Sequence, residues 1–240
     1  MPPSLPKTKP AKPMSFLRDR LSSDGYLGLH LTLGLAVILL AAIVFAYIAK
    51  GVLERDNLIL LLDQHLMQWL QAQATADRTA FFFFITHWHN TLGILVMATL
   101  LALWLAHKRS WCWVLRVLLS VPLGMLLNVL LKGIFQRQRP VFDQPLVTLL
   151  TYSFPSGHTA GATLLYGVLA AWLLTVLQRQ WHAPVVVLAA SMVALVAVSR
   201  VYLGAHYPSD VLAAMASSTA WLAVVLTSVN TASQAWLFRR

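Results

Sequence analysis

Six long runs of apolar residues divide the chain, and short polar segments separate them. The runs cover residues 27–49, 83–106, 112–135, 159–178, 184–203 and 210–230. A helix needs about 20 apolar residues to cross a hydrocarbon core of about 30 Å. The pattern therefore predicts an all-α polytopic membrane protein, a bundle of six transmembrane helices formed by residues 26–235.

A shorter segment after the first run has a different, amphipathic pattern. In "RDNLILLLDQHLMQWLQAQ" (55–73), Leu58, Leu62, Leu66 and Trp69 recur at helical spacing with polar residues between them. A helix with one apolar and one polar face is typical of a segment lying in the membrane interface. We predict an interfacial helix here, one that lids or flanks the adjacent end of the bundle.

Composition supports a membrane protein. Hydrophobic residues make up 58% of the chain and charged residues 11%, and the mean hydropathy of +0.68 is far above that of soluble domains. The first 25 residues are rich in proline and basic residues and predict a mobile cytoplasmic tail. The apolar run that follows is longer than the 7–15 residues of a signal peptide and lacks a convincing cleavage site, so we interpret it as an uncleaved anchor.

Charge predicts the orientation. With six spans, both termini lie on one side together with the links near 107–111 and 178–183. That side carries eleven of the 18 basic residues against two acids, and the other side carries seven against six. Because Lys and Arg are enriched in cytoplasmic loops, we place both termini in the cytoplasm of the inner (plasma) membrane. The interfacial helix and the span ends near it then face the periplasm or cell exterior.

Several function classes are disfavoured. The net charge of +10 is explained by topology and by anionic lipid headgroups, and no basic-aromatic interleaving indicates nucleic acid. The chain contains no nucleotide-binding glycine loop, and its single cysteine, Cys112, excludes an intramolecular disulfide. His87 and His89 are two residues apart, so on a helix they point to different faces and do not predict a shared metal. We expect no metal or cofactor.

Ionisable and polar residues gather at three span ends. They lie in "LLKGIFQRQRP" after the third span, "SFPSGHTAG" before the fourth, and "AVSRVYLGAHYPSD" between the fifth and sixth. In an up-and-down bundle, all three segments fall on the outward face. Charged groups in a membrane need a partner or a water-filled pocket, so this convergence predicts an outward-facing active site.

The residue types indicate a phosphate ligand. Lys132, Arg139 and Arg200 are three cations with almost no nearby carboxylate, so a multiply charged anion is the expected partner. Ser156 and Gly157 begin a helix, where Ser can cap the free amides and Gly permits close backbone approach. The alternative for Lys132 and Arg139 is that they snorkel at a helix end, the interpretation we adopt for Arg137.

The remaining residues indicate acid–base and nucleophilic chemistry. His206 and Asp210 are four apart, so the carboxylate can accept from one imidazole nitrogen and leave the other as a nucleophile. His158 can protonate the leaving oxygen. Taken singly, either histidine could equally be a packing residue with satisfied hydrogen bonds; the shared face favours catalysis.

These segments carry three known signatures. Residues 132–140 fit K-x6-R-P, residues 155–158 are "PSGH", and residues 199–210 fit S-R-x5-H-x3-D. The chain therefore resembles the type 2 phosphatidic acid phosphatase family of integral membrane lipid phosphatases. Gln138 stands where a proline is frequent in this family, which leaves the cations intact.

The resemblance implies roles for these residues. His206 would form a phosphohistidine intermediate, Asp210 would orient it, and His158 would serve as the acid. Lys132, Arg139, Ser156, Gly157 and Arg200 would hold the phosphoryl oxygens, and water would hydrolyse the phosphoenzyme. Candidate substrates are undecaprenyl diphosphate, phosphatidylglycerol phosphate and phosphatidic acid. The alternatives are a phosphotransferase that passes the phosphoryl group to another lipid, and a transporter that binds lipid phosphates without cleaving them.

Overall fold

The computed structural model describes residues 29–142, 146–147 and 149–238, and the regular elements within these residues are all helices, which confirms the all-α prediction. The predicted tail, residues 1–25, lies outside the described residues. The elements are α2 (Leu29–Leu53), α3 (Asn57–Ala72), α4 (Ala76–Trp88), α5 (Thr91–His107), α6 (Trp111–Phe135), α7 (Gly157–Val176), the 3₁₀ turn η1 (Arg179–Trp181), α8 (His182–Tyr202) and α9 (Pro208–Phe238).

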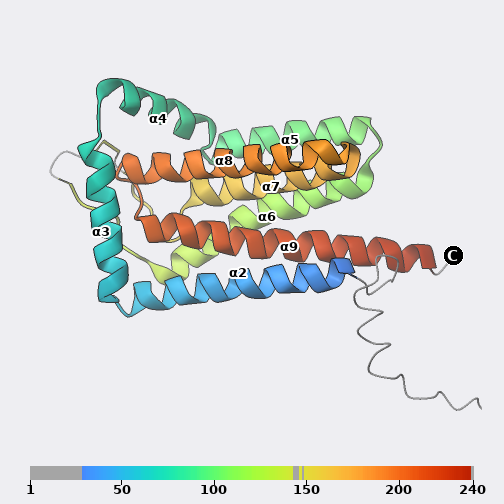
Figure 1. Cartoon of the computed structure of the whole chain (residues 1–240), viewed down its shortest axis with the longest axis horizontal. Coiled ribbons are helices and arrows are strands. Elements are labelled where there is room, and N and C mark those ends of the chain that lie inside the picture. The colour runs from blue at the N-terminus through green and yellow to red at the C-terminus, as the bar shows by residue number, and fades with distance from the viewer. Residues whose placement is uncertain (1–28, 143–145, 148, 239–240) are drawn as a thin grey trace, which may run out of the picture.

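The long helices run side by side, with α2 along α9 at one edge and α7 packed against α6, α8 and α9 in the interior (Figure 1). The main core lies between α5, α6 and α7, where Ile94, Leu105, Val121, Leu164 and Val168 are fully buried. The outer surface is apolar as well, since many leucine and valine side chains of α2 are exposed. A bundle that is apolar both inside and outside is typical of a lipid environment.

Five helices are individually long and apolar enough to cross a membrane, and the sixth predicted span, residues 83–106, is not one straight helix. It consists of the end of α4 and most of α5, which meet at an angle of 53°. The bend occurs because Asn90 begins a new helix, its side chain accepting from Gly93 N at 2.8 Å. Counting the bent pair as one span gives six.

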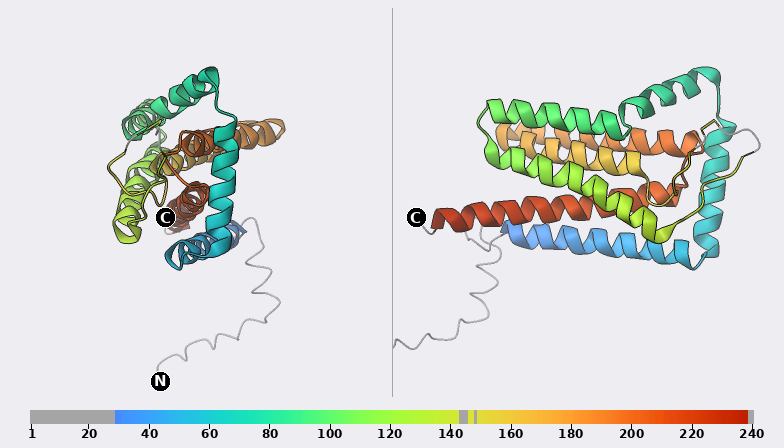
Figure 2. Two further views of the ribbon diagram at one scale, coloured as in Figure 1. Left: turned by 90° about the vertical axis from the view of Figure 1, so that its left-hand side faces the viewer. Right: turned by 180° about the vertical axis from the view of Figure 1, so that it is seen from behind.

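Helix α3 is the predicted interfacial helix, and it lies across one end of the bundle (Figure 2). Asp56 caps its start by accepting from Leu58 N at 2.8 Å. The leucines of its apolar stripe are exposed, whereas Asp63 and Met67 are buried. Asp63 and Met67 therefore point into the bundle end, whereas the stripe of Leu58, Leu62, Leu66 and Trp69 faces outward.

The turn from α8 to α9 depends on a glycine. Gly204 has a φ of +69°, in the left-handed region that glycine adopts without steric cost. A Cβ at this position would lie 2.6 Å from Phe142 Cε2, so the turn has no room for a side chain. This tight connection carries the chain directly from Arg200 on α8 to His206 and Asp210 at the start of α9.

Candidate active site

The structure brings the predicted site residues to the end of the bundle that α3 covers. They come from the end of α6, the start of α7, the end of α8 and the start of α9, which lie together at that end (Figure 1). His158 lies within electrostatic range of Arg200, His206 and Lys132, and Arg139 contacts His206 directly. The parity argument from the span pattern thus places these segments together correctly.

His206 and Asp210 form a buried pair. His206 Nδ1 lies 3.4 Å from Asp210 Oδ2, and both side chains are almost fully buried. The other nitrogen, Nε2, lies 3.3 Å from Arg139 Nη1. This arrangement suits a tautomer with the hydrogen on Nδ1, which leaves the Nε2 lone pair on the side of the cations. Burial lowers the pKa of His206 to about 4, against the opposing effect of Asp210.

Asp210 is held by more partners than its histidine. Its Oδ1 accepts from Arg137 Nη1 at 2.7 Å, and its Oδ2 accepts from Tyr207 N at 2.9 Å and from the Ser153 hydroxyl. Both oxygens of the carboxylate therefore accept charge-assisted hydrogen bonds, which fix its orientation.

Arg137 is not a snorkelling residue, and that prediction is wrong. Its side chain is only 11% exposed, and it donates to Asp63 Oδ2 and Asp210 Oδ1, each at 2.7 Å. The guanidinium also lies 4.1 Å from the Tyr207 ring centroid. Burial alone would lower the pKa of Arg137, but the two carboxylates outweigh it and raise the pKa. The residue is turned inward because Asp63 and Asp210 together attract it into the bundle end.

Asp63, Ser209 and Ser153 are site residues that sequence reasoning missed. Asp63 Oδ1 accepts from Ser209 N at 2.8 Å, and its Oδ2 accepts from Ser209 Oγ at 2.6 Å. Asp63 therefore ties α3 to the residue next to Asp210. One available signal was its position as the single acid within α3.

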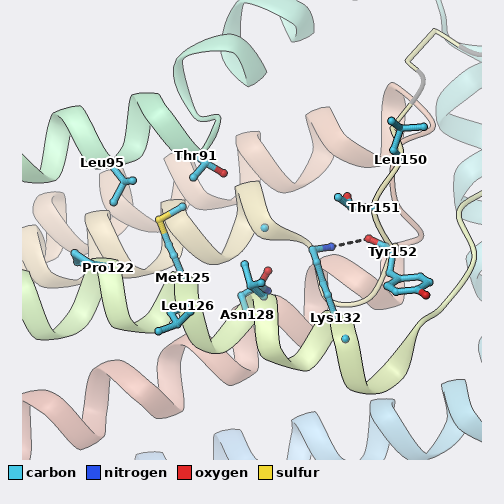
Figure 3. Close-up of a pocket in the computed structure, with 13 residues that line it drawn as sticks. Thr91, Leu95, Pro122, Met125, Leu126, Asn128, Lys132, Leu150, Thr151 and Tyr152 are labelled. Carbon is cyan, nitrogen blue, oxygen red and sulfur yellow. Dashed lines mark hydrogen bonds between the residues drawn. The ribbon is translucent and has the colours of Figure 1, made fainter.

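Lys132 and Arg139 are bonded to carbonyl oxygens of the segment that precedes α7. Lys132 Nζ donates to Tyr152 O at 2.8 Å (Figure 3) and to Ser153 O at 3.2 Å. Arg139 donates to Thr151 O and Ala205 O, each at 2.6 Å. These partners are neutral, so both cations keep an uncompensated charge.

Arg200 is the third cation and is 3% exposed. Its Nη1 donates to the Thr86 hydroxyl on α4, and its Nε is buried without a hydrogen-bond partner among the described residues. An unpaired buried guanidinium nitrogen is costly, by about 1–3 kcal/mol or more, unless a ligand accepts from it.

The start of α7 differs from the prediction. The Ser156 side chain makes no cap hydrogen bond, so the prediction that it caps the helix is wrong. Its Oγ instead accepts from the Thr159 hydroxyl at 3.1 Å, while its backbone N donates to Asp210 O. At Gly157, an added Cβ would meet Asn128 Oδ1 at 3.5 Å and Lys132 Cε at 3.9 Å, which are ordinary contact distances. The protein alone therefore does not require glycine here, and the free space lies beside Lys132.

A cavity of about 740 Å³ extends from this space into the apolar part of the bundle. Lys132, Gly157 and Thr151 line its polar end, and Leu95 and Met125 belong to its apolar wall (Figure 3). The cavity thus joins a cationic end to a hydrophobic wall.

His87 and His89, which we predict not to share a metal, lie in different surroundings. His89 is buried, with Nδ1 2.7 Å from Ile85 O and Nε2 2.7 Å from the Tyr166 hydroxyl, whereas His87 is exposed. Both ring nitrogens of His89 are occupied by protein groups.

Comparisons with known proteins match this arrangement. The model of the PAP2 superfamily matches residues 113–234, just over half of the chain. Phosphatidylglycerophosphatase B of Bacillus subtilis is 41% identical over 108 residues, which are 44% of this chain and 52% of that protein. The matched segment thus spans about half the length of this curated relative.

Two solved structures share the fold. A transmembrane PAP2-type phosphatidylglycerolphosphate phosphatase from Bacillus subtilis superposes with a TM-score of 0.72 at 26% identity, over 79% of this chain and 94% of that one. Aquifex aeolicus LpxE gives a TM-score of 0.55 at 24% identity, over 68% of this chain and 93% of that one, which shows likeness of fold. The chain is a multi-pass membrane protein and belongs to the PAP2 superfamily, the type 2 phosphatidic acid phosphatases that its three signatures resemble.

Proposed function

We propose that this protein is a lipid phosphatase that removes a phosphate from a lipid phosphate or diphosphate through a phosphohistidine on His206. The observation that carries the proposal is the environment of that imidazole. It is buried, with Nδ1 beside Asp210 and Nε2 beside Arg139, where Lys132 and Arg200 add uncompensated charge. A nucleophile oriented by a carboxylate and surrounded by cations is suited to attack on phosphorus.

The first step is the transfer of the phosphoryl group to the enzyme. Arg139, Arg200, Lys132, the Ser156 side chain and the first backbone amide of α7, at Gly157, hold the phosphoryl oxygens. His206 Nε2 forms a bond to phosphorus as the bond from phosphorus to the leaving oxygen breaks, and Asp210 stabilises the charge that develops on the ring. His158 gives its proton to the leaving lipid alkoxide or phosphate.

The second step is hydrolysis. His158, now neutral, accepts a proton from a water molecule whose oxygen attacks phosphorus, and the bond from phosphorus to Nε2 breaks. Free phosphate leaves, and His206 returns to its neutral form. Since side chains carry both steps, we expect a chelator of divalent metals to leave phosphate release unchanged.

The cavity favours a lipid substrate. Its cationic end can take the phosphate while its apolar wall takes the start of an acyl or prenyl chain. The similarity to phosphatidylglycerophosphatase B makes phosphatidylglycerol phosphate the first candidate, with undecaprenyl diphosphate and phosphatidic acid as the others.

The test is a substrate panel on purified protein. Phosphate release from the three lipids is measured under identical detergent conditions, with the radiolabel in the terminal phosphoryl group that is transferred. Label in free phosphate supports a hydrolase, and label in a second lipid identifies a phosphotransferase. Binding of all three lipids without release would overturn the proposal in favour of a transporter.

The pH profile is expected to reflect the pKa of His206. The nucleophile must be neutral, and a pKa lowered to about 4 keeps it neutral well below pH 7. We therefore expect the acid limb of kcat/KM to lie near pH 4, with a fall of about tenfold per pH unit below it. The fall of kcat/KM on the alkaline side reports the loss of the proton from His158, and its apparent pKa is a property of the two coupled histidines. An acid limb centred near pH 6.5, the value of an unperturbed histidine, would contradict this.

We also propose that the site faces the periplasm or cell exterior, with both termini in the cytoplasm of the inner membrane. The excess of Lys and Arg on the other side of the bundle supports this orientation. The single cysteine, Cys112, is exposed at the start of α6, on the proposed cytoplasmic side. A membrane-impermeant maleimide should label it only after cells are permeabilised, and labelling of intact spheroplasts would reverse the orientation.

A further inference from the structure

A second polar cavity lies at the end of the bundle opposite His206. It has a volume of about 300 Å³ and is lined by the first turns of α2 and α6 and the C-terminal halves of α7 and α9, which meet far from α3 (Figures 1 and 2). Its polar and aromatic lining residues are His30, Trp113, Arg116, Thr175, Thr227 and Asn230. The catalytic scheme uses none of them.

The cavity contains hydrogen-bond donors without partners. Within the part of the chain that the structure describes, Arg116 Nε and His30 Nε2 are buried and make no hydrogen bond. Such groups are rarely left unpaired in a native protein, because each one costs about 1–3 kcal/mol. The two nitrogens come from different helices, α6 and α2, and both belong to residues that line the same cavity. A ligand with acceptor atoms would satisfy both at once when His30 carries its hydrogen on Nε2.

The charge of the cavity indicates the sign of this ligand. Arg116 is the one arginine or lysine that lines the cavity, and none of the lining residues is acidic. The guanidinium carbon lies 4.3 Å from the Trp113 ring centroid, so the indole holds the guanidinium plane in position without using its donors. A stacked guanidinium with a free Nε is suited to bind an oxyanion, and the Thr227 and Asn230 side chains supply further donors.

The depth of the cavity indicates the source of the anion. Tryptophan is enriched at the level of lipid headgroups, and Trp113 stands in the first turn of α6 with the exposed Trp111 beside it. A phosphate at this depth is carried by a phospholipid headgroup or arrives from the aqueous side. Apolar neighbours of the cavity, Ala171 and Leu226, can contact the start of a lipid chain.

We propose that this cavity is a binding site for a phosphate group, carried by an anionic phospholipid or free in solution. It is separate from the active site and does not depend on the proposed phosphatase activity. A bound headgroup would join α2, α6, α7 and α9 at this end, because the lining residues come from all four helices.

The test is a titration of delipidated protein in a neutral detergent, followed by native mass spectrometry and thermal shift. The probes are phosphatidylglycerol, phosphatidylcholine as the zwitterionic lipid, and inorganic phosphate. We expect Arg116→Gln to weaken phosphatidylglycerol binding about tenfold, the effect of losing one charge-assisted hydrogen bond. The matched control is Arg179→Gln, an exposed arginine at the same end that does not line the cavity and should change binding less than twofold.

Binding at the active site is distinguished with Arg139→Gln, which removes a cation at the other end. The component lost in Arg116→Gln but kept in Arg139→Gln belongs to the second cavity. If this component binds phosphatidylglycerol but not inorganic phosphate, the ligand is a lipid headgroup. If it also binds inorganic phosphate, the site accepts the free anion.

Two outcomes would overturn the proposal. One is binding that is unchanged in Arg116→Gln, and the other is an equal loss in Arg179→Gln, which indicates diffuse attraction to basic residues. Arg116→Lys keeps the charge but not the planar donor fork, so we expect it to restore binding only in part. Circular dichroism and size-exclusion chromatography check that each variant is folded.

Discussion

Replacing His206 with alanine is expected to lower kcat by about 10⁴- to 10⁶-fold, the effect seen when a catalytic nucleophile is removed. The expectation follows from its position, since its Nε2 faces the cations while Asp210 occupies the Nδ1 side. No other histidine combines a carboxylate on one nitrogen with an arginine beside the other among the described residues. The measurement is single-turnover phosphate release, together with trapping of an acid-labile phosphoenzyme.

The matched control is His87→Ala, which removes an exposed imidazole and should leave kcat within about twofold of wild type. Substantial turnover by the His206 variant would show that the nucleophile is another group. A variant that binds lipid phosphate normally and whose biological function is retained would instead support the transporter alternative.

The Arg137 ion pairs are expected to give the largest effect on stability. Arg137→Ala should lower the free energy of unfolding by about 3–5 kcal/mol, because it leaves the buried carboxylates of Asp63 and Asp210 without their cation. Asp63→Ala should have a smaller effect, because Arg137 keeps its bond to Asp210. Both variants should also lower kcat, since Arg137 and Ser209 connect Asp63 to the residue that orients His206. Denaturant unfolding in detergent measures the first quantity and phosphate release the second.

Two controls make this test specific. Lys50→Ala breaks an exposed ion pair with Glu54 at 3.9 Å and should change stability by less than about 1 kcal/mol. The double variant of Arg137 and Asp63 completes a thermodynamic cycle, and we expect its effect to be smaller than the sum of the single effects. Additive single effects would show that the pair is not coupled, contrary to the contacts.

The convergence of the site could be predicted from sequence because it depends only on topology. Apolar runs fix the number of spans, and alternating direction then places the end of α6, the start of α7 and the end of α8 at one end of the bundle. Lys132, His158 and Arg200 are brought together for this reason. The helical spacing of His206 and Asp210 is likewise local and readable from the chain.

The partners of Arg137 could not be predicted, because they depend on the rotation of α3 about its axis. The pattern of leucines indicates an amphipathic helix but does not say whether its polar face meets water or the bundle. In the structure the side with Asp63 and Met67 meets the bundle and the leucine stripe faces outward, so Asp63 reaches Arg137, 74 positions later. The predicted side-chain cap at Ser156 is absent because its oxygen accepts from the Thr159 hydroxyl instead, a choice of partner that the sequence does not reveal. The bend at Asn90 is hidden in hydropathy because both helices that it joins are apolar.

The carbonyl oxygens that hold Lys132 and Arg139 have a consequence for how tightly phosphate can be retained. Phosphate that bonds to these cations exchanges with Thr151 O, Tyr152 O and Ser153 O, so its affinity is the difference between two sets of hydrogen bonds. The same carbonyls can return as the product departs. On the proposed function, segment 151–153 would compete with phosphate for these two cations and so favour its release after each turnover.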